Sequence, residues 1–139
     1  MKVRFLNLSI KDNQIKKRYK RAFDSFLDKG QFVLGKKVKS FENKISKIIK
    51  KKYTVGVSSG TNALYLALKS CGITNGDHVL VPCLSWLSTF TAVQKIGAIP
   101  IGVDIGEDLQ INLDLLKKNI TKKTKAIIIV HFTGYLKNY

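Results

Sequence analysis

The hydrophobic positions of the first fifty residues recur at helical spacing. Apolar side chains three and four positions apart predict one amphipathic helix over residues 12–29 and a second over residues 37–51. Lysines fill most of the polar positions of the second helix. Between the two lies a loop, residues 30–35, with a glycine at each end and three consecutive apolar residues inside. These apolar side chains either pack on the core or lie against a second subunit.

After residue 52 the pattern changes to short apolar runs that alternate with helical stretches. The runs that predict strands are residues 53–57, 78–81, 98–103 and 125–130. The helices expected between them cover residues 63–71, 86–96 and 112–119. Because nearly continuous apolar strands alternate with helices, we expect a parallel sheet covered on both faces. The predicted fold class is α/β, with two N-terminal helices followed by a βαβαβαβ, mainly parallel sheet.

The positive charge of the chain is concentrated near its start. The 139 residues carry 25 Lys and Arg against 9 Asp and Glu, a formal net charge of +16, and residues 1–52 hold 17 of the basic and 4 of the acidic side chains. Such a region suits nucleic acid, an anionic membrane or an acidic partner. All but three of the basic residues are lysine, whereas readers of bases and phosphates favour arginine. We therefore attribute the charge to solvated helix faces and do not expect nucleic acid, although a non-enzymatic basic module that binds nucleic acid stays as an alternative.

Targeting and metal-binding signals change this interpretation little. The N-terminal apolar stretch is too short for a signal-peptide core, and the run at residues 126–130 is far shorter than the roughly 20 residues that span a bilayer. Two cysteines are too few for a disulfide scaffold, and neither they nor the two histidines have zinc-site spacing. We expect no membrane association, no metal site and a cytoplasmic location.

The candidate chemistry follows the expected strands. In helix-covered parallel sheets, ligands bind beyond the carboxyl ends of the strands. The segments expected at those ends are residues 58–62, 82–88, 104–107 and 131–134. Asp104 and His131 begin two of them, and we interpret the first as a turn residue and the second as a hydrogen-bonded structural histidine.

Two of these segments carry candidate binding residues. Gly60 lets a ligand approach the backbone between a strand and a helix, and the amides of the helix start favour an anion. Thr61 and Asn62 add side-chain donors, although an ordinary helix cap also explains serine and threonine there. Trp86, the only tryptophan, follows a strand end, where its ring either stacks on a planar ligand or belongs to the core.

Four stretches, taken in order and spacing, resemble a known family. They are residues 30–35 with 38–42, residues 57–64 (Val-Ser-Ser-Gly-Thr-Asn-Ala-Leu), residues 76–82 with Trp86, and residues 121–127 leading to 130–134. Together they resemble the DegT-type sugar aminotransferases, which are pyridoxal-phosphate (PLP) enzymes of the aspartate-aminotransferase fold. The resemblance implies a truncated large domain of that fold. It implies one partial domain over residues 1–139, with N-terminal helices at 1–52 and the start of a cofactor-binding α/β domain at 53–139.

The resemblance also implies roles for particular residues. Gly60, Thr61 and Asn62 fall on the family's cofactor-phosphate loop, and Trp86 falls on the aromatic residue that stacks against the pyridine ring. The loop at residues 30–35 falls where family members approach the partner subunit's active site, which implies a homodimer. The usual reaction moves an amino group between glutamate and a keto sugar carried on a nucleotide, with the cofactor as electron sink.

The resemblance stops where the sequence stops. In the family, the acidic partner of the pyridine nitrogen follows the His-x-x-Gly stretch of residues 131–134, and the Schiff-base lysine comes later still. No lysine here stands in the family's lysine motif, so we assign no catalytic residue. We expect an N-terminal fragment of a PLP-dependent sugar aminotransferase that is inactive on its own. A sugar dehydratase of the same family, in which the lysine is replaced, is the alternative.

Overall fold

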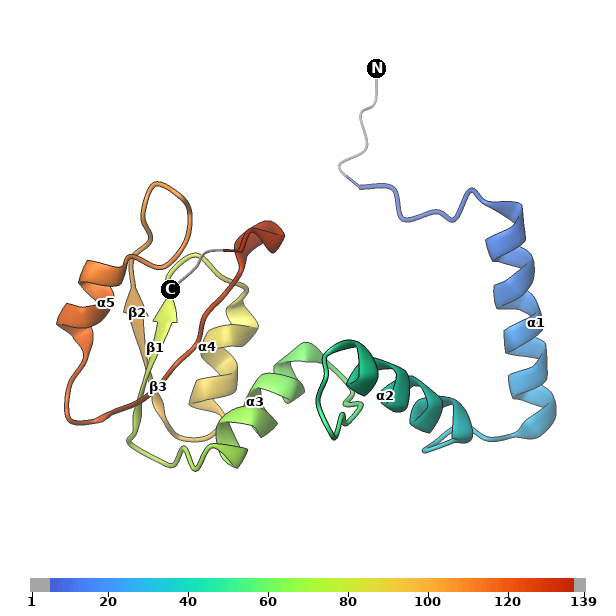
Figure 1. Ribbon diagram of the computed structural model, residues 1–139, viewed down its shortest axis with the longest axis horizontal. Helices are drawn as coiled ribbons and strands as arrows, with labels where there is room; N and C mark the ends of the chain where they lie inside the picture. The colour runs from blue at the N-terminus through green and yellow to red at the C-terminus, as the bar shows by residue number, and fades with distance from the viewer. Residues whose placement is uncertain (1–5, 137–139) are drawn as a thin grey trace, which may run out of the picture. The chain divides into compact units, whose positions relative to one another are not determined.

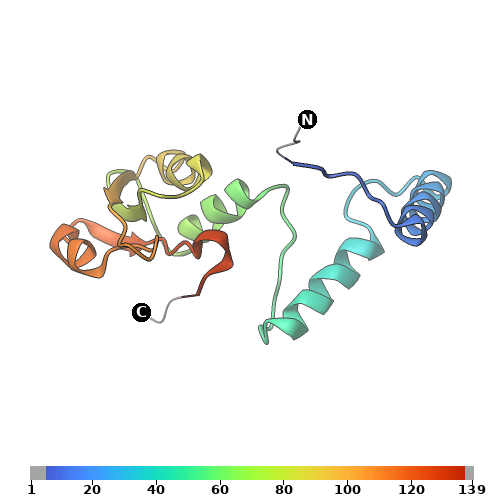
Figure 2. The same ribbon diagram turned by 90° about the horizontal axis from the view of Figure 1, so that it is seen from above.

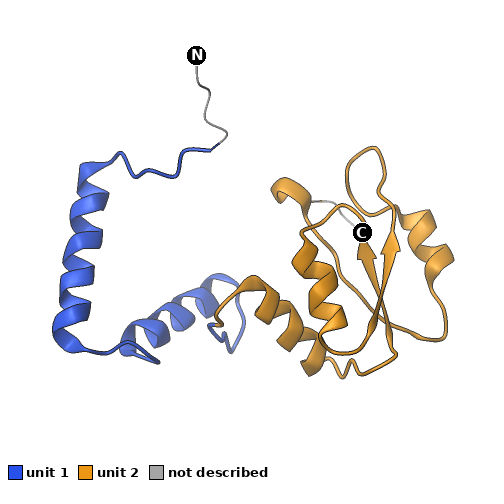
Figure 3. Ribbon diagram, turned by 180° about the vertical axis from the view of Figure 1, so that it is seen from behind, with its two compact units in different colours: residues 1–56 blue, residues 57–139 orange. Residues whose placement is uncertain are grey.

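The computed structural model describes residues 6–136. The chain forms two compact units, Met1–Gly56 and Val57–Tyr139 (Figure 3). Its elements are α1 (Asn13–Lys29), α2 (Lys36–Ile48), α3 (Gly60–Ser70), β1 (His78–Pro82), α4 (Leu87–Gln94), β2 (Ile99–Val103), α5 (Leu113–Asn119), β3 (Thr124–Ile127) and a short 3-10 helix, Phe132–Gly134. Across the described part of the chain, no helix combines the length and the apolar character that crossing a membrane requires.

The first unit consists of the two expected helices and the loop between them. Asp12 caps α1, because its carboxylate accepts hydrogen bonds from the backbone amides of Gln14 and Ile15 at 2.7 and 3.2 Å. The helix ends at Gly30, whose φ of 58° lies in the left-handed region that glycine adopts without strain. Neither helix contains a buried residue. The apolar stripes of both helices are therefore exposed within this unit.

The second unit contains a three-stranded parallel sheet in the order β2-β1-β3 (Figure 1). β1 is the central strand, and its Leu80 lies opposite Ile101 of β2 and Ile127 of β3. The parallel α/β class predicted from the apolar runs is confirmed. Parallel neighbours require crossover connections, which α4 and α5 supply.

Helices cover both faces of the sheet, with α5 on the side opposite α4 (Figures 1 and 2). On one face Val79 and Val81 pack with residues of α3 and α4, including Leu68 and Val93. On the other face Leu80 packs with buried residues that include Leu116 of α5. Val79, Leu80 and Val81 are 0% exposed, which explains why β1 is apolar at consecutive positions.

The expected strand at residues 53–57 is not formed. A strand needs a neighbour that accepts and donates along its ladder, and the described residues provide none for this segment. The amide of Gly56 donates instead to the carboxylate of Glu42 at 2.8 Å. Tyr53 and Val55 are both 75% exposed, so no packing replaces the missing ladder. The prediction of a strand at residues 53–57 is wrong, and the sheet formed by the described residues has three strands.

The helix expected at residues 63–71 begins three residues earlier, at Gly60. The hydroxyl of Ser59 accepts a hydrogen bond from the amide of Asn62 at 3.2 Å, which makes Ser59 the N-cap. Gly60 is thus the first residue of α3 rather than part of a preceding loop. The helix expected at residues 112–119 is α5, and Asn112 is its N-cap, because the side chain accepts from the amides of Asp114 and Leu115.

Candidate functional site

The loops that follow the three strands lie at one edge of the second unit. All strands are parallel, so their carboxyl ends point the same way. Segments 82–88, 104–107 and 131–134, expected at carboxyl strand ends, follow β1, β2 and β3. The fourth expected segment, residues 58–62, is not preceded by a strand and joins the unit through α3, which packs against α4.

The first turn of α3 leaves backbone donors open. The amide of Asn62 is satisfied by Ser59, whereas helix geometry gives the amides of Gly60 and Thr61 no intrahelical acceptor. A Cβ added at Gly60 would meet nothing within 4 Å, so the space beside its backbone is open. Two free amides at the positive end of a helix dipole, next to open space, form an arrangement that accepts an anion.

The side chain of Asn62 links this turn to α4. Its Nδ2 atom donates to the hydroxyl of Ser58 at 2.7 Å, and its Oδ1 atom accepts from the ammonium of Lys95 at 3.4 Å. The same ammonium lies 4.8 Å from the centre of the Tyr65 ring, within the range of a cation–π contact. The sequence gives no signal for the role of Lys95, because this lysine follows Asn62 by 33 positions and resembles the other surface lysines.

Trp86 lies just past the carboxyl end of β1 and immediately precedes α4. Its side chain is 81% exposed, so the interpretation of Trp86 as a core residue is wrong. Trp86 precedes the first residue of α4, and Lys95 follows the last one. Asn62 contacts Lys95, so it lies near the opposite end of α4 from Trp86. In the described part of the chain, no hydrogen bond or ring contact joins Trp86 to residues 60–62. The structure thus presents an exposed indole at the strand edge without direct contact to the turn.

Asp104, another candidate residue, makes hydrogen bonds that stabilise the fold. The Asp104 carboxylate accepts from the amide of Ile105 at 2.8 Å, and its carbonyl accepts from the amide of Asn112 at 3.0 Å. These bonds close the loop after β2, as expected of a turn residue. Cys71 and Cys83 are free and exposed. Over residues 6–136, no group of three or more His, Cys, Asp or Glu side chains is arranged to hold a metal ion.

An acidic side chain with a shifted pKa lies at the other edge of the sheet. Asp77 precedes β1, and its Oδ2 atom accepts from the amide and the hydroxyl of Thr74 at 2.8 and 2.9 Å. These hydrogen bonds, with smaller contributions from the charges of Lys125 and His78, hold the pKa of Asp77 below its ordinary value. The group stabilises the turn that starts β1 and is remote from the candidate ligand edge.

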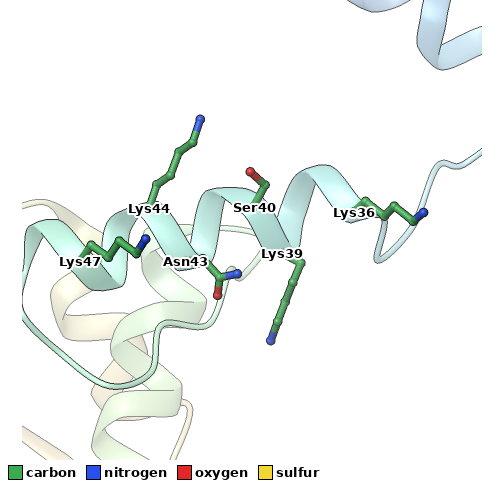
Figure 4. Close-up of a pocket in the computed structure, with 6 residues that line it drawn as sticks. All are labelled: Lys36, Lys39, Ser40, Asn43, Lys44 and Lys47. Carbon is green, nitrogen blue, oxygen red and sulfur yellow. The ribbon is translucent and has the colours of Figure 1, made fainter.

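Two of the concave surfaces in the described part of the chain lie in the first unit. One, of about 430 Å³, lies along α2 and is lined by Lys36, Lys39, Ser40, Asn43, Lys44 and Lys47. In Figure 4 the side chains of Lys39 and Lys44 extend in opposite directions from the helix. Because the ammonium groups do not converge, this surface is a solvated helix face and not a site built around one ligand.

The other concave surface, of about 690 Å³, is apolar and lies between α1, the loop and α2. Phe26 and Phe32 meet there edge to face with ring centres 4.7 Å apart. Phe32, Val33 and Leu34 are 61%, 77% and 88% exposed, so the loop at residues 30–35 does not pack into a core within this unit. Of the two interpretations of this loop, contact with a second subunit is the one left open.

Comparison with known proteins gives this geometry a context. Residues 13–138 match the DegT/DnrJ/EryC1/StrS aminotransferase family. The chain is 40% identical over 101 residues, or 72% of its length, to GDP-perosamine synthase of Vibrio cholerae. The solved structure of S. venezuelae DesV in complex with a ketimine intermediate superposes on 90% of the chain with a TM-score of 0.84 and 33% identity. The structure of the E. coli GDP-4-keto-6-deoxy-D-mannose-3-dehydratase with bound hydrated PLP superposes on 88% of the chain, with a TM-score of 0.75 and 32% identity.

The chain is much shorter than these proteins. The matched region covers 28% of the perosamine synthase, 34% of DesV and 33% of the dehydratase. The chain therefore spans about a third of the length of the relatives it matches. The aspartate-aminotransferase-like fold expected from the sequence is confirmed for this part of the domain.

Proposed function

The chain belongs to the DegT/DnrJ/EryC1/StrS aminotransferase family, and from this premise we propose that it is the N-terminal portion of a PLP-dependent sugar aminotransferase. The observation that carries the proposal is the family match over residues 13–138 combined with the open first turn of α3. The match to GDP-perosamine synthase and the superposition on DesV support the same activity.

The residues present fit the phosphate and the ring of PLP. The amides of Gly60 and Thr61 and the hydroxyl of Thr61 bind the phosphate, and Asn62 shapes the same turn. Trp86 supplies the flat face for the pyridine ring, which its 81% exposure permits. When bound, the cofactor supplies an electron sink for amino-group transfer. This chain contributes anchoring and orientation, and we assign none of its lysines to covalent attachment of the cofactor.

The substrates and the assembly follow from the same proposal. The amino acceptor is a keto sugar linked to a nucleotide, the amino donor is glutamate, and the enzyme acts in the cytoplasm. The intact enzyme is a homodimer in which the loop at residues 30–35 meets the second copy. The support for this contact is the exposure of three consecutive apolar side chains, Phe32, Val33 and Leu34.

A sugar dehydratase of the same family is the second candidate function. Its support is the superposition on the E. coli GDP-4-keto-6-deoxy-D-mannose-3-dehydratase with a TM-score of 0.75. The anchoring of the cofactor by α3 is the same in both functions. No residue that we place in the site distinguishes the two.

Calorimetric titration with pyridoxamine 5′-phosphate tests the proposal. This form of the cofactor lacks an aldehyde, so it cannot form imines with the many surface lysines, which would obscure an absorbance titration with PLP. We expect saturable binding by the unsubstituted chain and strongly reduced binding by the double variant Thr61→Ala, Trp86→Ala. Equal binding by the two proteins would reject the site. A variant of matched polarity change far from the turn, Thr121→Ala, serves as control.

A further inference from the structure

The two edge strands of the sheet differ in the backbone groups that they present to solvent. In a parallel ladder, alternate residues of an edge strand bond to the neighbouring strand, and the residues between them point outward. On β2 the amide of Ile99 donates to the carbonyl of Asp77 at 2.8 Å, so Pro100 faces the outer edge. Proline has no amide hydrogen, and its ring lies where an added strand would bond. The outer edge of β2 is therefore protected against pairing.

The outer edge of β3 has no such protection. Ile128, just past the end of β3, donates its amide hydrogen to the carbonyl of Leu80 in β1 at 2.9 Å. The backbone groups of Ile127 and Ile129, on either side of Ile128, therefore point away from β1. Among the described residues, no strand pairs with β3 on that side. This edge thus offers hydrogen-bond donors and acceptors to a further strand.

The side chains of Ile127 and Ile129 leave an apolar strip beside this edge. Ile128 between them is buried in the cluster that α3 and α4 cover, so the alternation of side chains places the other two on the opposite face of the sheet. On that face α5 packs against β2, beyond the central strand. Ile127 and Ile129 remain 40% and 38% exposed. A strand added to β3 would extend the ladder and bury both side chains.

We propose that the outer edge of β3 pairs with the same edge of a second copy of this chain, antiparallel across a two-fold axis at Ile128. In that register Ile127 of one copy lies opposite Ile129 of the other, so the edge is complementary to itself. The axis also keeps Lys123 and Lys125 away from their counterparts, because antiparallel strands bring opposite ends together. The inference requires no cofactor and goes beyond the proposed function.

The protected edge of β2 explains why one second copy is the occupant and not an open row of copies. Pairing of the two β3 edges gives a continuous sheet of twice three strands, in which both outer strands are β2. Pro100 protects each of these outer edges, so a third copy finds no free strand to extend. A two-fold contact of this kind is closed, and the assembly stops at a dimer.

A concentration series of the unsubstituted chain tests the contact. Light scattering is expected to show a change from one chain to two as the concentration rises. In ¹H–¹⁵N spectra, the backbone amide signals of Ile127 and Ile129 are expected to move downfield over the same range, because the second copy then accepts hydrogen bonds from them. A single chain at every concentration would overturn the inference, and so would a dimer in which these two signals do not move.

Paired charges test the antiparallel register. The double variant Ile127→Lys, Ile129→Lys places like charges opposite each other, so its Kd for self-association is expected to rise at least about tenfold. The double variant Ile127→Lys, Ile129→Glu places opposite charges there and is expected to associate more tightly than the first variant. Equal weakening of the two variants would overturn the proposed register.

Two control variants separate this edge from other exposed apolar surfaces. Ile99→Lys adds the same charge to β2, at a side chain that is 46% exposed, and is expected to leave the dimer unchanged. Leu34→Ser alters the loop that the proposed function assigns to the homodimer of the intact enzyme. Loss of the dimer in either control, with none in Ile127→Lys, Ile129→Lys, would overturn the inference. The expected pattern, loss in the β3 variant alone, leaves the proposed cofactor site untouched.

Discussion

The ammonium of Lys95 lies 4.8 Å from the centre of the Tyr65 ring, which joins the end of α4 to the face of α3. α3 and α4 make extensive contact, and this pair lies on the solvent side of that contact, since Lys95 is exposed and Tyr65 is half-buried. An exposed cation–π contact of this kind contributes a small coupling energy between its two side chains.

A double-mutant cycle between Lys95→Met and Tyr65→Leu is expected to give a coupling energy of about 0.5 kcal/mol, the usual size of an exposed cation–π contact. The measurement is urea unfolding of the four proteins. The same cycle on Tyr65 and Lys117, which lies in α5 on the other face of the sheet, is the control and is expected to give no coupling. A coupling energy of zero for Lys95 and Tyr65 would show that the contact does not persist in solution.

Replacing Leu80 by alanine is expected to destabilise the second unit by about 2–5 kcal/mol, because the substitution leaves a cavity in a closely packed interior. Leu80 is 0% exposed, and it faces α5 from the central strand. Leu87→Ala is the matched control, since this leucine is 72% exposed and its loss is expected to cost no more than about 0.5 kcal/mol. Denaturant midpoints of the two variants check the difference, and similar midpoints would contradict the assignment of Leu80 to the core.

Alanine at Gly60 is expected to leave folding intact and to weaken cofactor binding. A methyl group there meets no protein atom within 4 Å, so it occupies only the open space beside the α3 amides. Alanine at Gly97 is expected to cost about 1–2 kcal/mol of stability, because φ is +86° and the new Cβ would lie 2.5 Å from Oδ1 of Asn75. Thermal unfolding and pyridoxamine 5′-phosphate titration of both variants check the contrast. Loss of folding in Gly60→Ala would contradict the open space seen at the turn.

The turn before β1 is expected to lose stability in acid. Hydrogen bonds from Thr74 lower the pKa of Asp77 in the folded state below its unfolded value of about 3.9. A depressed folded-state pKa stabilises the fold above the unfolded value, and this contribution disappears as the pH falls through the folded-state value. The free energy of unfolding of Asp77→Asn should therefore be lower than that of the unsubstituted chain at pH 7, and the difference should vanish as the pH falls below the folded-state pKa of Asp77.

A control variant separates this effect from that of net charge. Asp24→Asn, in α1, removes one negative charge from the other unit. Its effect on unfolding of the second unit is expected to be small at every pH, since α1 is not part of that unit. A pH-independent difference between Asp77→Asn and the unsubstituted chain would contradict the role of the carboxylate.

Local sequence patterns predicted most of the fold because most of its elements depend on local physics. The alternation of buried strands and helices after residue 77 was visible in the apolar runs, and the cap of α5 at Asn112 follows from the residue type. The prediction of a strand at residues 53–57 was wrong because a strand does not depend on local sequence alone. Its apolar residues have the right composition, but a strand depends on a neighbour that sequence pattern alone does not provide.

Part of the candidate site could likewise be predicted from the sequence, and part of it could not. The open turn at Gly60 could be predicted from a glycine next to a cap, although the helix begins earlier than expected because Ser59 takes the cap. The exposure of Trp86 could not be predicted, since tryptophan occurs both in cores and at ligand sites. The contact of Lys95 with Asn62 depends on how α4 packs against α3, and no short-range pattern reports on it.

The central position of β1 in the sheet affects how fast its backbone amides exchange with solvent. Hydrogen bonds on both sides and side chains with 0% exposure tie β1 into the whole of its unit, so its amides exchange with deuterium only through the rarest, most complete openings. The amides of α1, a helix with no buried residue, exchange through local fraying. The slowest and fastest exchanging helices and strands of this chain therefore belong to different units.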